Sequence, residues 1–132
     1  MINVEKIIEH WLETAEHNLG TAEFLLQGKR YPECLFFCHL ALEKVLKALV
    51  VQERKEHAPY IHNLVALAKL AKIKLSPKQV DELTTITEFN IAGRYNEVKY
   101  NFYKKSTKAY TEKYFKITKE TYLWLKKFLQ KK

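Results

Sequence analysis

The sequence has few glycines and prolines and no long apolar run. Only 3 Gly and 3 Pro occur in 132 residues, and no stretch alternates apolar and polar residues between glycine-rich turns, so β-strands have little support. No apolar run approaches the roughly 18 residues of a membrane-spanning helix, and residues 1–5 lack the basic start and apolar core of a signal peptide. We therefore expect an all-α cytoplasmic protein that does not contact a membrane.

Motifs for metal binding and covalent catalysis are also missing. The 2 cysteines, Cys34 and Cys38, are four residues apart on one expected helix, and no second Cys/His cluster stands at zinc spacing. There is no glycine-rich phosphate loop, and none of His10, His17, His57 and His62 stands near a Ser or Cys arrangement typical of covalent catalysis. The sequence predicts no metal and no cofactor, with both thiols reduced and buried because one helix holds them poorly for a disulfide bridge.

Apolar residues recur at helical spacing in five segments, which fit one domain spanning residues 1–132. The segments are residues 3–27, 31–51, 61–70, 76–93 and 106–132. The second segment is apolar on nearly every side and should be the central helix, whereas the third is too short for a full bundle member. Ser76, Pro77 and Gln79 form a capping-box pattern, and Gly93 is the expected end of that helix. The pattern predicts an up-and-down four-helix bundle with one additional short helix.

The charge is unevenly distributed along the chain. Residues 1–60 carry 7 basic and 9 acidic residues, whereas residues 61–132 carry 16 basic and 6 acidic ones, within a net charge of +8. A localised basic surface is typical of proteins that bind polyphosphates, because each neutralised phosphate releases counterions. The alternative is a set of solvated lysines on outward helix faces.

The apolar second segment contains one polar ridge. His39, Glu43 and Lys47 follow each other at intervals of four residues and therefore share a helix face. One interpretation is a Glu43–Lys47 ion pair at the rim of the bundle with His39 hydrogen-bonded nearby. The other makes the three residues the wall of a groove that binds a ligand.

The segment after the fourth expected helix combines cations with aromatic rings. Residues 94–116 contain 7 Lys and Arg, 2 acidic residues and 7 aromatic residues. Such a mixture can stack bases and hold phosphates. It is also compatible with Tyr110, Tyr114 and Phe115 facing the core while the lysines face water.

Three stretches together resemble a known family: residues 31–49, which read YPECLFFCHLALEKVLKAL, residues 61–64, which read IHNL, and residues 93–96, which read GRYN. They look like the HEPN (higher eukaryotes and prokaryotes nucleotide-binding) domain over essentially the whole chain. The resemblance implies a helical bundle that forms homodimers and is often encoded beside a minimal nucleotidyltransferase. Some members bind nucleotides, and others are metal-independent endoribonucleases, including toxins of toxin–antitoxin pairs.

The resemblance also shows a departure at the catalytic motif. In the ribonuclease members an Arg is followed after a few residues by a His in the dimer cleft. Arg94 matches the Arg, but Asn101 stands where the His is expected, with Tyr103 as the trailing Tyr, and no histidine follows Arg94. An amide cannot exchange a proton near neutral pH as imidazole can.

We therefore expect a non-catalytic nucleotide- or RNA-binding or interaction module, a homodimer working with a minimal nucleotidyltransferase. The candidate binding residues are Arg94, Tyr95, Asn96, Lys99, Asn101, Tyr103, Lys104 and Lys105. Lys108 is expected to add to the salt-sensitive attraction of RNA. One alternative is a metal-independent, toxin-like endoribonuclease that uses Arg94 with His62 or Tyr100 as the base. A second is a helical partner protein with no role in nucleic-acid binding.

Overall fold

The computed structural model describes residues 2–91 and 96–130, which contain six helices and no strand. The helices are α1 (Val4–Gln27), α2 (Tyr31–Arg54), α3 (Leu64–Leu70), α4 (Pro77–Thr87), α5 (Asn96–Lys105) and α6 (Lys108–Lys126). The all-α prediction is confirmed. None of the helices in these ranges has the length and apolar character needed to cross a membrane.

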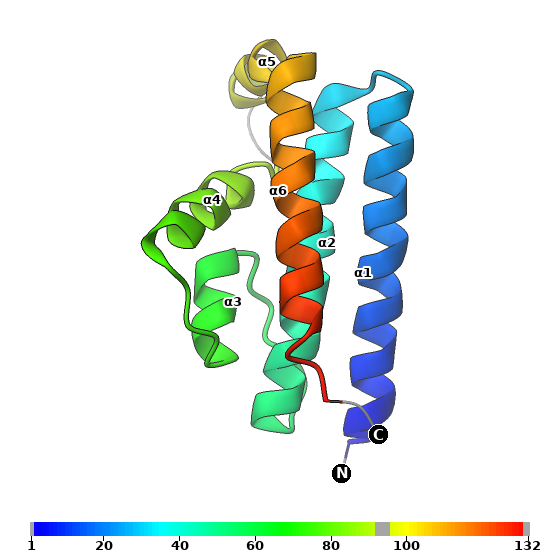
Figure 1. The fold of residues 1–132 in the computed structure, drawn as a ribbon, viewed down its shortest axis with the longest axis vertical. Helices are drawn as coiled ribbons and strands as arrows, with labels where there is room; N and C mark the ends of the chain where they lie inside the picture. The colour runs from blue at the N-terminus through cyan, green and yellow to red at the C-terminus, as the bar shows by residue number, and fades with distance from the viewer. Residues whose placement is uncertain (1, 92–95, 131–132) are drawn as a thin grey trace.

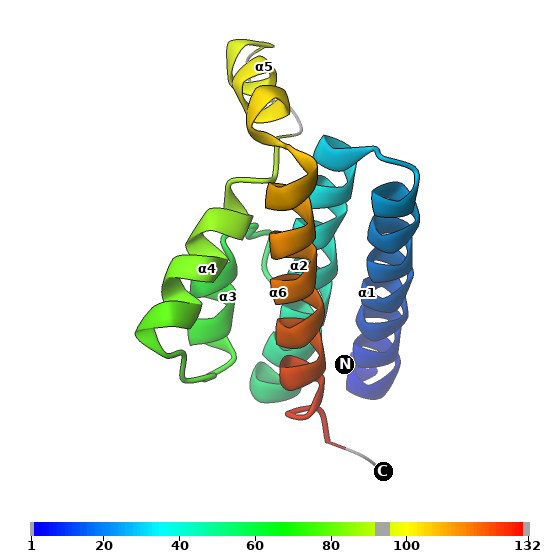
Figure 2. The same cartoon turned by 45° about the horizontal axis from the view of Figure 1, so that its top comes forward.

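The chain runs up α1, down α2 and, after the shorter helices, down α6 in the view of Figure 1, while α4 rises obliquely across the bundle. This is the expected up-and-down order, with α3 as the short inserted helix. The shorter helices α3 and α4 pack beside α2 rather than extending the full height of the bundle. Helix α5 projects at the end of the bundle where α2 begins (Figure 2).

The helix ends follow from local sequence signals. Asn3 caps α1 by accepting a hydrogen bond from the amide of Lys6, and Thr107 caps α6 in the same way. Ser76 and Gln79 form the complete predicted capping box at the start of α4, with the Gln79 side chain accepting from the Ser76 amide at 2.9 Å. Each cap satisfies an amide that the first turn of a helix leaves without a partner.

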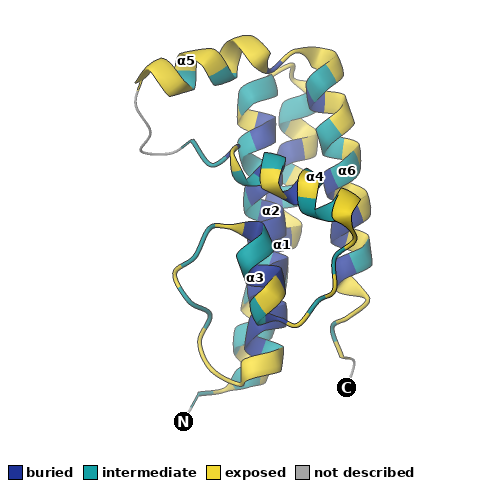
Figure 3. Ribbon diagram, turned by 90° about the vertical axis from the view of Figure 1, so that its left-hand side faces the viewer, coloured by how far each residue is buried: buried dark blue, intermediate teal, exposed yellow. Residues whose placement is uncertain are grey.

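Helix α2 is the centre of the core. It is buried along most of its length (Figure 3), and the main apolar cluster joins it to side chains from α1, α3, α4 and α6. Cys34 and Cys38 are both buried and unbridged, as expected. Phe89, just after α4, packs edge-on against Tyr114 of α6 at 5.4 Å between ring centres, which ties the fourth expected helix to the last one.

Two parts of the chain differ most from the sequence prediction. Helix α4 ends at Thr87, with Glu88 as its cap, instead of continuing to Gly93, which itself lies outside the described residues. Helix α5 was not expected, because its sequence, NEVKYNFYKK, has no continuous apolar stripe. The structure explains the missing signal, since none of the residues of α5 is buried and a helix without a buried face needs no stripe.

Candidate functional site

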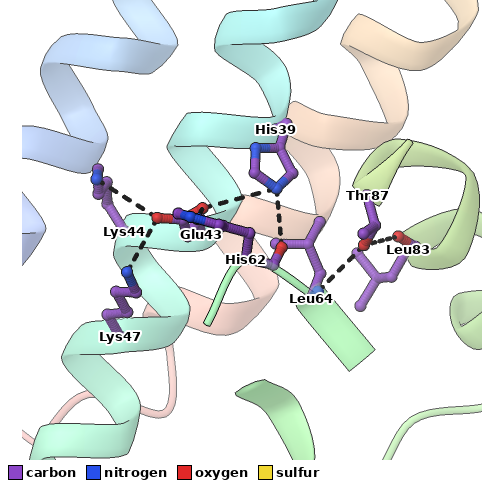
Figure 4. A network of polar contacts seen from close by, with 8 residues as sticks. All are labelled: His39, Glu43, Lys44, Lys47, His62, Leu64, Leu83 and Thr87. Carbon is purple, nitrogen blue, oxygen red and sulfur yellow. Dashed lines mark hydrogen bonds and ion pairs between the residues drawn. The ribbon is translucent and has the colours of Figure 1, made fainter. Parts of the chain in front are cut away.

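A buried carboxylate, Glu43, is the centre of a polar network in the middle of α2 (Figure 4). Its side chain is 1% exposed. One carboxylate oxygen lies 2.8 Å from Nδ1 of His62, and the other accepts a hydrogen bond from Nζ of Lys47 at 3.0 Å. Nζ of Lys44 lies 3.5 Å from the same second oxygen. The carboxylate therefore has direct partners on both oxygens, as a buried charge requires.

His39 connects this network to the loop before α3. Its Nε2 lies 2.9 Å from the backbone carbonyl of His62, and because a carbonyl can only accept, Nε2 carries the hydrogen. The other ring nitrogen, Nδ1, is buried without a hydrogen-bond partner. Burial lowers the pKa of His39, although the carbonyl of His62 and the charge of Glu43 act in the opposite direction. His39 is thus held as a neutral ring near neutral pH.

Glu43 is held as an anion despite its burial. Loss of water around the carboxylate would by itself raise its pKa, but the hydrogen bonds from His62 and Lys47 outweigh that effect and bring the pKa below its usual value. An ionised carboxylate on Nδ1 of His62 fixes that ring so that Nδ1 donates. Nε2 of His62, on a side chain 43% exposed, has no hydrogen bond to any residue in the described ranges.

Aromatic rings cover the outer side of the network. Nζ of Lys44 lies 5.2 Å and Nζ of Lys47 lies 5.4 Å from the ring centre of Trp11 on α1. The ring of Tyr60 packs edge-on against His62 at 4.9 Å. These contacts place the two ammonium groups beside aromatic rings and join α1, α2 and the loop before α3.

Helix α5 is a second, separate group of predicted site residues. Tyr100 and Tyr103 are 63% and 50% exposed, and Lys104 lies over the Tyr100 ring at 5.4 Å. The helix is attached mainly through Phe102, whose ring centre lies 5.7 Å from that of Phe89. One face is thus fastened to the bundle, while the other presents lysines and tyrosines to solvent.

A family model described as the HEPN domain matches residues 8–128. The chain belongs to the HEPN domain family. The match covers nearly all of the sequence and agrees with the resemblance carried by residues 31–49, 61–64 and 93–96.

The crystal structure of TT1696 from Thermus thermophilus has a similar fold to this HEPN domain. The TM-score is 0.76 at 19% sequence identity, and the match covers 92% of this chain and 98% of that one. At this identity the likeness shows the fold alone. No curated protein sequence matches the chain.

The predicted site residues of this HEPN domain fall into two places. His39, Glu43, Lys47 and His62 come together on α2 and the loop before α3. The others in the described ranges, Asn96, Lys99, Asn101, Tyr103, Lys104 and Lys105, all lie on α5, and Lys108 is the exposed first residue of α6. Arg94 and Tyr95 lie outside the described residues. No hydrogen bond or ion pair joins the two groups within the described ranges.

Sequence reasoning missed the long-range partners of the polar ridge. The Glu43–His62 contact joins residues 19 positions apart, and helical spacing carries no signal for it. The contact of Trp11 with two lysines of α2 carries no local sequence signal either, because it depends on how α1 and α2 pack. Both side chains of the Glu43–Lys47 pair are buried, at 1% and 5% exposure, which is deeper than a pair at the rim of a bundle.

Proposed function

We propose that this HEPN domain is a non-catalytic RNA- or nucleotide-binding module whose binding surface is α5. Membership of the family supports a role linked to nucleotides or RNA. The observation that carries the proposal is the exposure of α5, a helix with four aromatic or basic residues in its last half and none of its residues buried. A helix that contributes so little to the core has another reason to keep its tyrosines and lysines.

The arrangement of cations and rings on this helix suits a single strand. The lysine ammonium groups can neutralise phosphates, and the exposed Tyr100 and Tyr103 rings offer faces on which bases stack. The Lys104–Tyr100 and Lys105–Tyr110 contacts, at 5.4 and 5.5 Å, keep each cation beside a ring. A nucleotide needs that combination, since it has a charged phosphate next to an aromatic base.

The proposed module is a homodimer. Large apolar side chains remain exposed on α1 and α6 and just beyond α6, where Phe24 is 73%, Leu123 is 51% and Phe128 is 42% exposed. Covering such residues against a second copy is a common solution. A minimal nucleotidyltransferase is the proposed protein partner, and this part of the proposal rests on the family resemblance.

The geometry around His62 favours one alternative, a metal-independent endoribonuclease. A carboxylate that accepts from Nδ1 of a histidine orients the ring, as in many general bases. Glu43 stands in that relation to His62, and Nε2 of His62 makes no hydrogen bond to a described residue. We rank this second because Asn101 replaces the family's histidine and because Glu43 also serves Lys47 in the core.

The test of the binding proposal is a salt titration. Fluorescence anisotropy of the purified dimer with labelled single-stranded RNA should show binding at low salt that weakens as salt rises. Lys104→Gln combined with Lys105→Gln should lower the slope of log affinity against log salt by about 1 for each phosphate that the variant no longer neutralises.

The matched control is Lys69→Gln combined with Lys74→Gln, two exposed lysines near α3 and away from α5. Both double variants remove the same charge, so only a localised surface distinguishes them. Absence of RNA binding at low salt would contradict the proposal, as would an equal decrease in affinity for the two double variants. Light scattering that gives a monomer mass at micromolar concentration would contradict the homodimer.

A further inference from the structure

A cavity of about 230 Å³ lies between the start of α2 and α5. Glu33, Phe36 and Phe37 line it from α2, Ile91 from the segment after α4, and Lys99 and Tyr103 from α5. Pockets for drug-sized ligands hold roughly 300–1,000 Å³. This cavity is smaller, which suits one flat ring system better than a whole nucleotide.

Three of the residues that line the cavity are aromatic. Phe36 and Phe37 pack edge-on, with ring centres 5.6 Å apart and planes at 87°, so their faces point in different directions. Tyr103 stands on the α5 side and is 50% exposed. A ring that enters between α2 and α5 therefore meets aromatic groups from both helices, as unstacked bases do in many RNA-binding proteins.

Two side chains of opposite charge at the cavity have no partner among the residues that the structure describes. Neither the Glu33 carboxylate nor the Lys99 ammonium takes part in a hydrogen bond or ion pair with any residue in the described ranges. A carboxylate accepts hydrogen bonds from an amino group, and an ammonium donates to a ring nitrogen or a carbonyl. The pair offers one acceptor and one donor to the edge of a bound ring, and Glu33 makes the cavity unsuitable for a phosphate.

We propose that this cavity binds one unpaired nucleobase that carries an exocyclic amino group, with Glu33 accepting from that group and Lys99 donating to the neighbouring acceptor. The inference rests on the proposed function, since α5 supplies both the cavity wall and the lysines for the strand. Adenine, cytosine and guanine have the amino group, whereas uracil has a carbonyl at the corresponding position. A carboxylate facing that carbonyl repels it, so uracil is disfavoured.

The cavity also implies that single strands are preferred to duplexes. A base inside a duplex is stacked above and below and paired along its edge, so it cannot enter a cavity of this size. The lysines of α5 can bind the phosphates of a single strand or of a duplex, whereas the cavity accepts a base only from a single strand. Duplex RNA of equal length should therefore bind more weakly than a single strand rich in adenine or cytosine.

The experiment compares labelled RNAs of about 12 nucleotides, oligo(A), oligo(C), oligo(U) and an abasic strand, at one low salt concentration. The purified full-length chain is used throughout. Wild type should bind oligo(A) and oligo(C) at least about fivefold more tightly than oligo(U) or the abasic strand. Tyr103→Ala should reduce the affinity for oligo(A) at least about fivefold, while Tyr103→Phe, which keeps the ring, should bind as wild type does.

The variant Glu33→Ala distinguishes base recognition by the carboxylate from a general electrostatic effect on RNA affinity. Removing an anion strengthens the binding of every RNA by a similar factor if the effect is electrostatic alone. The proposal instead predicts that the preference for oligo(A) and oligo(C) over oligo(U) collapses to within about twofold. Circular dichroism checks that both variants keep the wild-type helix content, which is expected because Glu33 is exposed and Tyr103 is half exposed.

The outcomes distinguish this inference from the proposed function. RNA binding with no base preference, or with a preference that Glu33→Ala leaves unchanged, overturns the base site and leaves α5 as a general RNA surface. If no RNA binds at all, the proposed function itself fails. Light scattering on Tyr103→Ala tests whether a second copy of the chain occupies the cavity instead. A shift from dimer to monomer would assign the cavity to protein contact and overturn the base site.

Discussion

The middle of α2 and the whole of α5 hold charged side chains in opposite ways. On α2, Glu43 is surrounded by partners and almost completely buried, so its charge is part of the core. On α5 the lysines and tyrosines face solvent, and Phe102 provides the main ring contact with the bundle. The difference indicates that the first group serves mainly to join elements of the fold, while the second is available to a partner.

The strongest challenge to this division is RNA cleavage, because catalysis through His62 would give the polar network of α2 a role beyond joining elements of the fold. We expect none above background. Arg94 is always protonated and cannot act as the base, and a missing general acid or base lowers the rate about 10²–10⁴-fold. The measurement is a gel assay of the purified dimer on unstructured RNA with EDTA present, comparing wild type with Arg94→Ala and His62→Ala. Robust cleavage that either substitution abolishes would establish the enzyme.

The next largest effect should come from Glu43→Ala. This change leaves Lys47 buried without its carboxylate and removes the partner of His62, and breaking a buried pair costs about 3–5 kcal/mol. The control is Glu53→Ala on the same helix, which removes an exposed ion pair with Lys72 and should cost no more than about 1 kcal/mol. Urea denaturation gives both free energies of unfolding. Equal costs would show that the network does not stabilise the fold.

Acid should destabilise the protein through His39. Its pKa is lowered in the folded state, so between that value and the ordinary histidine pKa of about 6.5 the unfolded chain binds more protons than the folded one. The free energy of unfolding therefore falls as the pH is lowered through this window. Glu43, whose pKa is also lowered, adds a further loss only at lower pH, once its ordinary value near 4.5 is approached.

His39→Gln isolates the histidine contribution. Glutamine keeps an N–H that can donate to the His62 carbonyl but does not titrate, so the stability of this variant should depend less on pH between about pH 7 and 5. His17→Gln, a change at an exposed position of α1, should follow the wild-type profile. Parallel profiles for wild type and His39→Gln would contradict the neutral, buried state of His39.

The smallest expected effect is on the stability of the α5 variants. Lys104→Gln with Lys105→Gln removes only exposed side chains, and such changes usually alter the free energy of unfolding by no more than about 0.5 kcal/mol each. Urea denaturation of this variant and of Glu43→Ala would show whether the α5 side chains contribute to the free energy of unfolding as the buried network does. A loss of stability comparable with that of Glu43→Ala would place α5 within the folding unit.

How much the sequence predicts depends on burial. The stripe on α1, the all-round apolar character of α2 and the capping box at Ser76 follow from local periodicity and caps, and all three are present in the structure. Helix α5 is not predicted in this way, because apolar periodicity indicates a helix with a buried face and none of the residues of α5 is buried.

The candidate site is predictable only in part for a related reason. The spacing of His39, Glu43 and Lys47 places them on one helix face, but nothing in the spacing brings His62 or Trp11 to that face. Those contacts depend on the path of the loop before α3 and on the packing of α1 against α2. The cavity beside Glu33 likewise depends on where α5 lies, which the sequence did not indicate.

The most direct test of the division between the two regions is amide hydrogen exchange with and without single-stranded oligo(A). We predict that the amides of residues 96–105 exchange quickly in the free protein, because α5 has few buried contacts, and slow down when RNA is bound. The amides around Glu43 should be strongly protected in both states. RNA-dependent protection confined to other helices, with α5 unchanged, would contradict the account.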